Sequence, residues 1–60
     1  MQYRAKMTFK IKMNKELYTV FEGSLWKPER EIADVIWVTN GIDSIGLNRN
    51  EFVNKFERSA

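Results

Sequence analysis

Apolar and polar side chains alternate almost without interruption over residues 3–13. A repeat of two is the period of a β-strand, because successive side chains of a strand point to opposite faces of the sheet. The pattern predicts one strand with a buried face and a solvent face. The apolar positions are Tyr3, Ala5, Met7, Phe9, Ile11 and Met13, and the cations of the opposite face are Arg4, Lys6, Lys10 and Lys12.

A second β-prone run covers residues 17–26 and is separated from the first by the turn-compatible residues Asn14, Lys15 and Glu16. We therefore predict a hairpin between the two runs, with the cations of the first facing outward. The second run is apolar in both phases of a strand, which is typical of a strand that is covered on both faces. Gly23 within it indicates a bulge or a bend.

Two further strands are predicted around the dipeptide Asn40-Gly41. The charged stretch 27–31 contains the only proline and is expected to form a long loop. Residues 32–39 follow as a third strand, again apolar in both phases. Asn40-Gly41 supplies the two positive-φ residues of a type I′ turn, so a short fourth strand should return over residues 42–47 and lie at an edge.

The last segment carries the signals of a helix start. Asn48 is followed three residues later by Glu51, the spacing of a capping box, and Leu47 and Phe52 occupy the positions of a hydrophobic staple. We predict a short C-terminal helix that ends near Arg58 and packs on the sheet. Its apolar side consists of Phe52, Val53 and Phe56.

The four predicted strands and the helix belong to a single domain that spans residues 1–60, with an α+β fold that is mainly β. Two architectures fit: a four-stranded antiparallel meander sheet with the short C-terminal helix across one face, or an SH3-like partly open barrel. The two-faced strands favour the barrel, which curls to bury both sides of its sheet. A flat sheet that forms a homodimer would produce the same pattern.

Composition excludes several classes of chemistry. The chain has no cysteine and no histidine, so it has no disulfide and none of the usual ligands of structural zinc. A serine nucleophile would lack its histidine base, and a domain this small hardly encloses a dry pocket. We therefore expect no catalytic activity, cofactor or metal. No apolar run has the length of a membrane span or the form of a signal peptide, which predicts a cytoplasmic protein.

The aromatic residues indicate a binding function. Two tryptophans and two tyrosines are hard to bury completely in so small a fold, and these residue types are enriched at the energetic centres of protein interfaces. The sequence favours a small non-enzymatic module that binds another protein through an exposed aromatic patch with a charged rim. The predicted partner-binding residues are Tyr18, Trp26, Lys27, Arg30 and Trp37.

The uneven charge supports an alternative, a nucleic-acid-binding protein. Residues 1–15 hold five cations and no acid, although the net charge of the chain is only +2. A ribbon of Arg4, Lys6, Lys10 and Lys12 would contact phosphates and release counterions. Lysine on an outer strand also prevents edge-to-edge aggregation, and the low net charge favours this solvated-face interpretation.

Several features follow one another in a recognisable order. They are the basic alternating first strand, Leu-Tyr-Thr-Val-Phe at residues 17–21, the Asn40-Gly41 hairpin, and Asn-Arg-Asn-Glu-Phe at residues 48–52. In this order and in its length the chain resembles short accessory proteins encoded by bacteriophages, many of which have SH3-like barrels. The resemblance implies a small protein that binds and modulates, or inhibits, a host or phage macromolecule. It carries no functional residue across.

Overall fold

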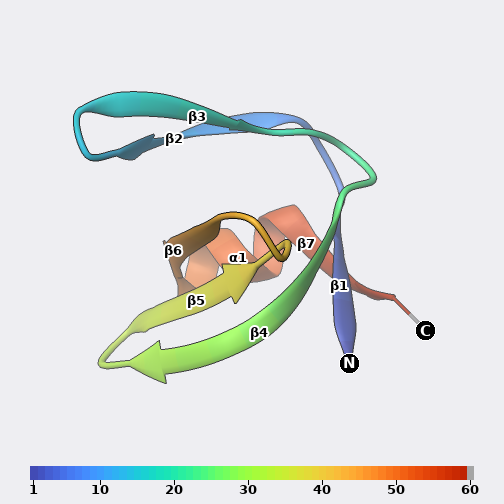
Figure 1. The fold of residues 1–60 in the computed structure, drawn as a ribbon. Coiled ribbons are helices and arrows are strands. Elements are labelled where there is room, and N and C mark those ends of the chain that lie inside the picture. Colours follow the sequence, from blue (N-terminus) through green and yellow to red (C-terminus); the bar gives the residue numbers. More distant parts are fainter. Residues whose placement is uncertain (60) are drawn as a thin grey trace.

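A computed structural model describes residues 1–59 of the chain as a mainly β fold with one short helix. In chain order the elements are β1 (Gln2–Ala5), β2 (Phe9–Met13), β3 (Glu16–Val20), β4 (Leu25–Ile32), β5 (Val35–Thr39), β6 (Ser44–Asn48), α1 (Arg49–Lys55) and β7 (Phe56–Ser59). Five strands form an antiparallel sheet in the order β6-β5-β4-β1-β7, and β2 and β3 form a separate hairpin (Figure 1). The mainly β class and the C-terminal helix are confirmed. The predicted number of four strands is wrong, because residues 1–59 form seven strands that divide between two sheets.

The first predicted strand is two strands that belong to different sheets. β1 ends at Ala5 and pairs with β4 and β7, whereas β2 begins at Phe9 and pairs with β3. Backbone hydrogen bonds fix the break: the Ala5 N–H donates to the Ser24 carbonyl at 3.0 Å, and the Gly23 N–H donates to the Ala5 carbonyl at 2.8 Å. The second predicted strand is divided at the same place, where Gly23 has a φ of 88°. Its glycine thus marks a bend, as the sequence indicated.

The hairpin between the first two runs is confirmed at residues Asn14 and Lys15. Met13 opposes Glu16, so the loop has two residues, and these have φ values of 47° and 73°. Two consecutive positive φ values are the signature of a type I′ turn, which matches the right-handed twist of the flanking strands. The type I′ geometry that Asn40-Gly41 predicted therefore occurs here.

The loop at Asn40 connects β5 and β6 as predicted, but its geometry is different. It has four residues between the paired Thr39 and Ser44, and Gly41 has a φ of 97°. The Asn40 side chain accepts hydrogen bonds from the N–H groups of Ile42 at 2.9 Å and of residue 43 at 2.7 Å. Because the asparagine side chain closes the loop, a wider turn replaces the two-residue type I′ turn.

The predicted loop at residues 27–31 is wrong, since these residues lie within β4. The register between β4 and β5 shifts between Pro28 and Arg30, which is a bulge, and a bulge tolerates the missing N–H of proline. The chain reverses instead at Ala33 and Asp34, where Ala33 has a φ of 54°. The long β4 therefore pairs with β1 over its first part and with β5 over the rest.

The helix begins as predicted and ends early. Asn48 accepts a hydrogen bond from the Glu51 N–H at 2.8 Å, and the Glu51 carboxylate accepts one from the Asn48 N–H at 3.4 Å, which completes the capping box. The helix stops at Lys55 because the Lys55 carbonyl accepts a hydrogen bond from the Lys6 N–H at 2.8 Å. The following residues pair with β1 as β7, a strand that the sequence did not predict.

The core draws one or two residues from nearly every strand. The side chains with almost no exposed surface are Ala5, Val20, Trp26, Val38, Ile45, Leu47 and Phe56. The hairpin covers this core through edge-on aromatic contacts, at 5.8 Å between the rings of Phe9 and Phe56 and at 6.4 Å between those of Tyr18 and Trp26. From the helix Phe52 packs against the core, but Val53 is 61% exposed, so its predicted place on the apolar side is wrong.

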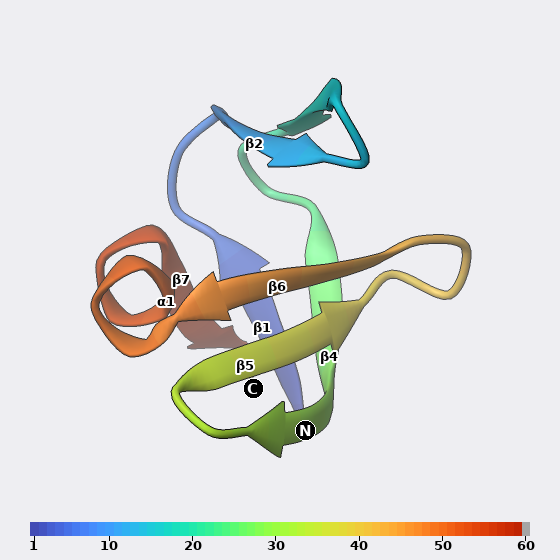
Figure 2. The same cartoon turned by 90° about the vertical axis from the view of Figure 1, so that its left-hand side faces the viewer.

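The hairpin lies above the edge of the sheet at β6. In both views β2 passes above β6, while β1 and β4 lead into the hairpin (Figures 1 and 2). Over residues 1–59 no helix has the length and apolar character that a membrane crossing requires.

Candidate binding groove

A groove of about 320 Å³ separates the tip of the hairpin from strands β5 and β6. Its apolar walls come from two directions, with Ile11 and Met13 on β2 and Val35 and Trp37 on β5. Asn14, Ser44 and Gly46 complete the lining. Alternation along β2 directs Ile11 and Met13 inward, and alternation along β5 places Val35 and Trp37 on one face. The groove is therefore built by strand periodicity from residues that are distant in sequence.

Trp37 is held against a glycine. A Cβ atom added at Gly46 would lie 3.0 Å from Val35 Cγ1 and 3.1 Å from Trp37 Cζ2, closer than ordinary van der Waals contact. The absence of a side chain at Gly46 lets the indole lie across β6, the arrangement in which an aromatic ring covers a strand glycine. The guanidinium of Arg30 lies 5.2 Å from the centre of the Trp37 ring, in the range of a cation–π contact.

Arg30 brings an available positive charge to this groove. Among residues 1–59 the ion pairs join Arg4 to Glu57, Arg49 to Glu31 and Lys55 to Glu51, and none of them includes Arg30. Its side chain is exposed. A guanidinium that already stacks on an aromatic ring loses little further freedom when it binds a carboxylate. The site thus combines an apolar wall with one oriented cation.

Tyr18 has a positioning role beside the groove. Its phenol donates a hydrogen bond to Asp43 Oδ2 at 3.0 Å, and Asn40 Nδ2 donates one to the phenol oxygen at 3.4 Å. Burial, followed by the hydrogen bond to Asp43, raises the pKa of Tyr18, because both disfavour the phenolate. Tyr18 was predicted to contact a partner, but its hydroxyl is committed to holding the hairpin near the β5–β6 loop.

Trp26 was predicted to contact a partner, and this prediction is wrong. Its side chain is 1% exposed, and its indole Nε1–H donates to Ser24 Oγ at 2.9 Å. An enclosed ring with its polar atom satisfied offers no surface to another molecule. Of the predicted aromatic patch, Tyr18 and Trp37 remain partly exposed, and Trp37 lines the groove with Arg30 beside it as the predicted charged neighbour.

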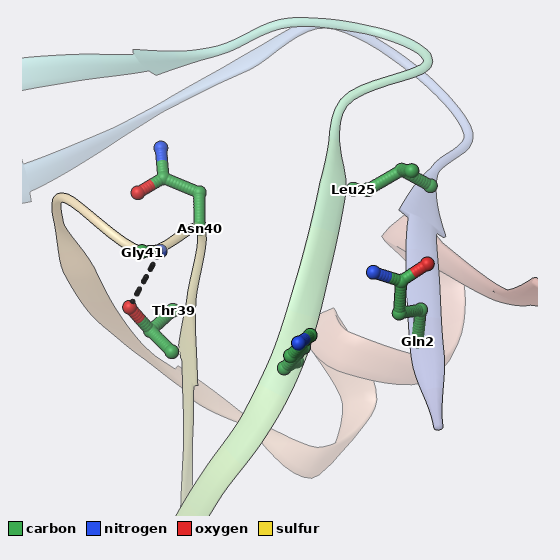
Figure 3. Close-up of a pocket in the computed structure, with 6 residues that line it drawn as sticks. Gln2, Leu25, Thr39, Asn40 and Gly41 are labelled. Atoms are coloured by element: carbon green, nitrogen blue, oxygen red, sulfur yellow. Dashed lines mark hydrogen bonds between the residues drawn. The ribbon is translucent and has the colours of Figure 1, made fainter.

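Lys27 lies at a second, smaller hollow of about 260 Å³ between β1, β4 and the β5–β6 loop (Figure 3). Gln2, Leu25, Thr39, Asn40 and Gly41 form the rest of its lining. Thr39 Oγ1 accepts from the Gly41 N–H at 3.0 Å and donates to the carbonyl of residue 43 at 2.8 Å. The hydroxyl of Thr39 is therefore hydrogen-bonded within the β5–β6 loop. Lys27 therefore lines a different hollow from Trp37, although its pairing with Thr39 places it on the same face of the sheet as Trp37 and Arg30.

The predicted basic ribbon is not continuous, so this part of the nucleic-acid prediction is wrong. Arg4 lies on β1 and forms an ion pair with Glu57 at 3.1 Å. Lys6 follows β1, whereas Lys10 and Lys12 lie on β2 in the other sheet. The end of β1 at Ala5 therefore interrupts the ribbon, so that the four cations do not lie along one strand.

Sequence reasoning identified Trp37 and Arg30 but missed the rest of the groove. Ile11 and Met13 were placed on a buried face, and Val35 was assigned to a covered strand. Gly46 carried a usable signal, because a glycine within a strand often marks the close approach of another group. Among residues 1–59 no group of three or more Asp and Glu side chains is arranged to hold a metal ion. Comparison of the chain with protein-family models, curated proteins and solved structures finds no match.

Proposed function

We propose that this chain is a small non-enzymatic protein-interaction module that binds its partner in the groove beside Trp37. The observation that carries the proposal is a half-buried indole that lines an apolar groove and has an exposed guanidinium stacked on its ring. Tryptophan and arginine dominate the energetic centres of protein interfaces. We propose further that the fold is of the SH3-like, partly open type. The order of strands in the five-stranded sheet and the separate β2–β3 hairpin support this proposal.

A binding role, and no catalysis, is supported by the chemistry of the groove. Ser44 is its only hydroxyl, and this group donates to Glu29 at 3.2 Å. The chain has no histidine to serve as a general base. The resemblance to phage accessory proteins supports a modulator or inhibitor of a host macromolecule as the specific role, with the cytoplasm as its setting.

The test is affinity capture from a host lysate with the tagged protein and two variants. Trp37→Ala removes the wall of the groove, and Leu17→Ala is the matched control, because Leu17 is 69% exposed on the hairpin and does not line the groove. We expect one captured protein that Leu17→Ala retains and Trp37→Ala loses. Equal capture of the partner by the native protein and by Trp37→Ala would contradict the proposal. Light scattering on the same samples detects a homodimer.

Nucleic acid is the alternative target, and one observation supports it. Lys10 and Lys12 alternate with the inward-facing residues of β2 and are exposed, so this strand presents two cations to solvent. Binding through so few phosphate contacts would be weak and would decline with salt. Capture that disappears after nuclease treatment, together with loss of binding in Lys10→Ala, would favour this alternative.

A further inference from the structure

The outer edge of β6 carries backbone groups that point away from the sheet. The Asn40 N–H donates to the carbonyl of Asp43 at 3.1 Å, and the register from this pair to Val35 opposite Asn48 is continuous. Bonded and non-bonded pairs alternate along an antiparallel ladder. Ser44 and Gly46 therefore occupy non-bonded positions opposite β5, so that their N–H and C=O groups are directed outward.

No strand in the described part of the chain satisfies these groups. β6 is the last strand in the sheet order, and β5 is its one partner among residues 1–59. The Asn48 N–H is directed to the Glu51 carboxylate, so the free edge ends where the helix begins. An unpaired edge of this kind is a template for another strand.

The candidate groove lies along this edge. Ser44 and Gly46 line it together with Ile11 and Met13 of the overhanging hairpin, and Figure 2 shows β2 above β6. We propose that an extended segment of the partner protein binds here by adding to β6 as an antiparallel strand. This inference rests on the proposed function and specifies how the partner is bound.

Strand alternation determines which side chains the segment should carry. Residues opposite Ser44 and Gly46 share the face of Trp37 and Arg30, whereas the residues between them face the core side, where Ile11 packs. An acid opposite Gly46 would complement the available charge of Arg30. Apolar residues would occupy the positions under the hairpin. A second copy of this chain is less suitable, because β6 itself has glycine where the acid is required.

The probe is the peptide acetyl-Thr-Val-Glu-Val-Thr-amide, followed by NMR on the isotopically labelled protein, since this measurement detects weak binding. In the proposed pairing the glutamate N–H points toward β6 and both valine N–H groups point away. We expect the Ser44 and Gly46 amide signals to shift. N-methylation of the glutamate should weaken binding about tenfold or more, whereas N-methylation of a valine should change it little. Exchange of glutamate for lysine should also weaken it.

Two protein variants give an independent reading. Ser44→Pro removes an outward N–H that β5 does not use, and proline is tolerated at such edge positions. Ser44→Ala is the matched control, since it loses only the hydroxyl that donates to Glu29. We expect Ser44→Pro to bind the peptide at least about tenfold more weakly than Ser44→Ala, with both variants folded by their NMR spectra.

Three results would overturn strand addition: no shift at Ser44 and Gly46, equal loss from methylation at glutamate and at valine, or equal binding by the two Ser44 variants. A dimer that Ser44→Pro dissociates would assign the edge to a second copy. If the peptide experiment fails while capture still depends on Trp37, the interaction function stands and only the mode of binding is wrong.

Discussion

The phenol of Tyr18 and the carboxylate of Asp43 are joined by a hydrogen bond of 3.0 Å that links the hairpin to the β5–β6 loop. The neutral phenol is the form that the folded protein favours, because burial and the neighbouring carboxylate raise the pKa of Tyr18 above its ordinary value of 10.0. The unfolded chain therefore loses the phenolic proton at lower pH than the folded one. This contribution to stability is complete below pH 10 and is lost as the pH rises through the folded pKa.

Tyr18→Phe tests this link. The variant lacks the hydroxyl, so we expect its free energy of unfolding to be about 1 kcal/mol lower near neutral pH. The difference between the two proteins should shrink above pH 10, because the native chain then loses the contribution that the variant never had. Urea unfolding at several pH values measures both effects. A difference that stays constant up to pH 11 would contradict the assigned role of the phenol.

The two tryptophans should differ sharply in accessibility. Trp26 is enclosed, whereas Trp37 lies at the groove. Trp37→Phe leaves Trp26 as the sole indole, and we expect its fluorescence to be blue-shifted and poorly quenched by acrylamide. Trp26→Phe leaves the indole of Trp37, which should be quenched more strongly. Similar quenching of the two variants would show that the core is not closed around Trp26.

Trp26→Ala should destabilise the protein far more than Trp37→Ala does. Removal of a fully buried tryptophan costs about 3–5 kcal/mol, which approaches the whole stability of a small domain. We therefore expect Trp26→Ala to be largely unfolded by circular dichroism at 25 °C and Trp37→Ala to remain folded. Thermal unfolding of both variants measures the contrast. A folded Trp26→Ala protein would show that the ring contributes little to the core.

The capping box of α1 should be a measurable source of stability. Asn48→Ala removes the side chain that accepts the Glu51 N–H, and the loss of an N-cap typically costs about 1 kcal/mol. Asn50→Ala is the control, because Asn50 is exposed within the helix and alanine is a better helix former. Urea unfolding should show a loss for Asn48→Ala and none for Asn50→Ala. Equal effects at both positions would contradict the capping role.

Ala33 offers a stabilising substitution. Its φ of 54° lies in the left-handed region, which costs an L-residue about 1–2 kcal/mol and costs glycine nothing. The greater freedom of glycine in the unfolded chain offsets part of this gain. We expect Ala33→Gly to raise the free energy of unfolding by about 0.5–1 kcal/mol, measured in urea. A decrease would show that the turn does not depend on the strained residue.

The features that sequence reasoning predicted correctly are local. The turn at Asn14 and Lys15 joins two antiparallel strands that follow each other in the chain. The Asn48–Glu51 capping box forms between residues that are three positions apart. Both depend on interactions between near neighbours, which the residue pattern contains directly. The mainly β class follows in the same way from alternation over many positions.

The features that were missed depend on contacts between distant residues. The end of β1 is set by Ala5 bonding to the segment around Gly23, and the end of α1 is set by Lys55 accepting from Lys6. The local residue pattern around each position does not indicate its distant hydrogen-bond partner. The wrong prediction of a loop at residues 27–31 has a different cause. Pro28 usually indicates a loop, but here a bulge in β4 accommodates it.

The candidate site shows the same division. Trp37 and Arg30 are unusual residue types and could be singled out by chemistry alone. Trp26 has the same chemistry, yet it is enclosed in the core, and this depends on how β4 pairs with its neighbours and not on residue type. The edge of β6 consists of backbone atoms, which every residue has, so no residue type could have indicated it.

The pairing of β1 with β7 places Gln2 opposite Ser59, so the two ends of the described chain lie side by side (Figure 1). A short flexible linker could join them, and the chain could be reopened at the exposed Ile42 in the β5–β6 loop. Such a circular permutant would keep every strand pair while changing the order in which the strands occur along the polypeptide. The molecule is thus a natural candidate for insertion, as one compact unit, into a loop of a larger host protein.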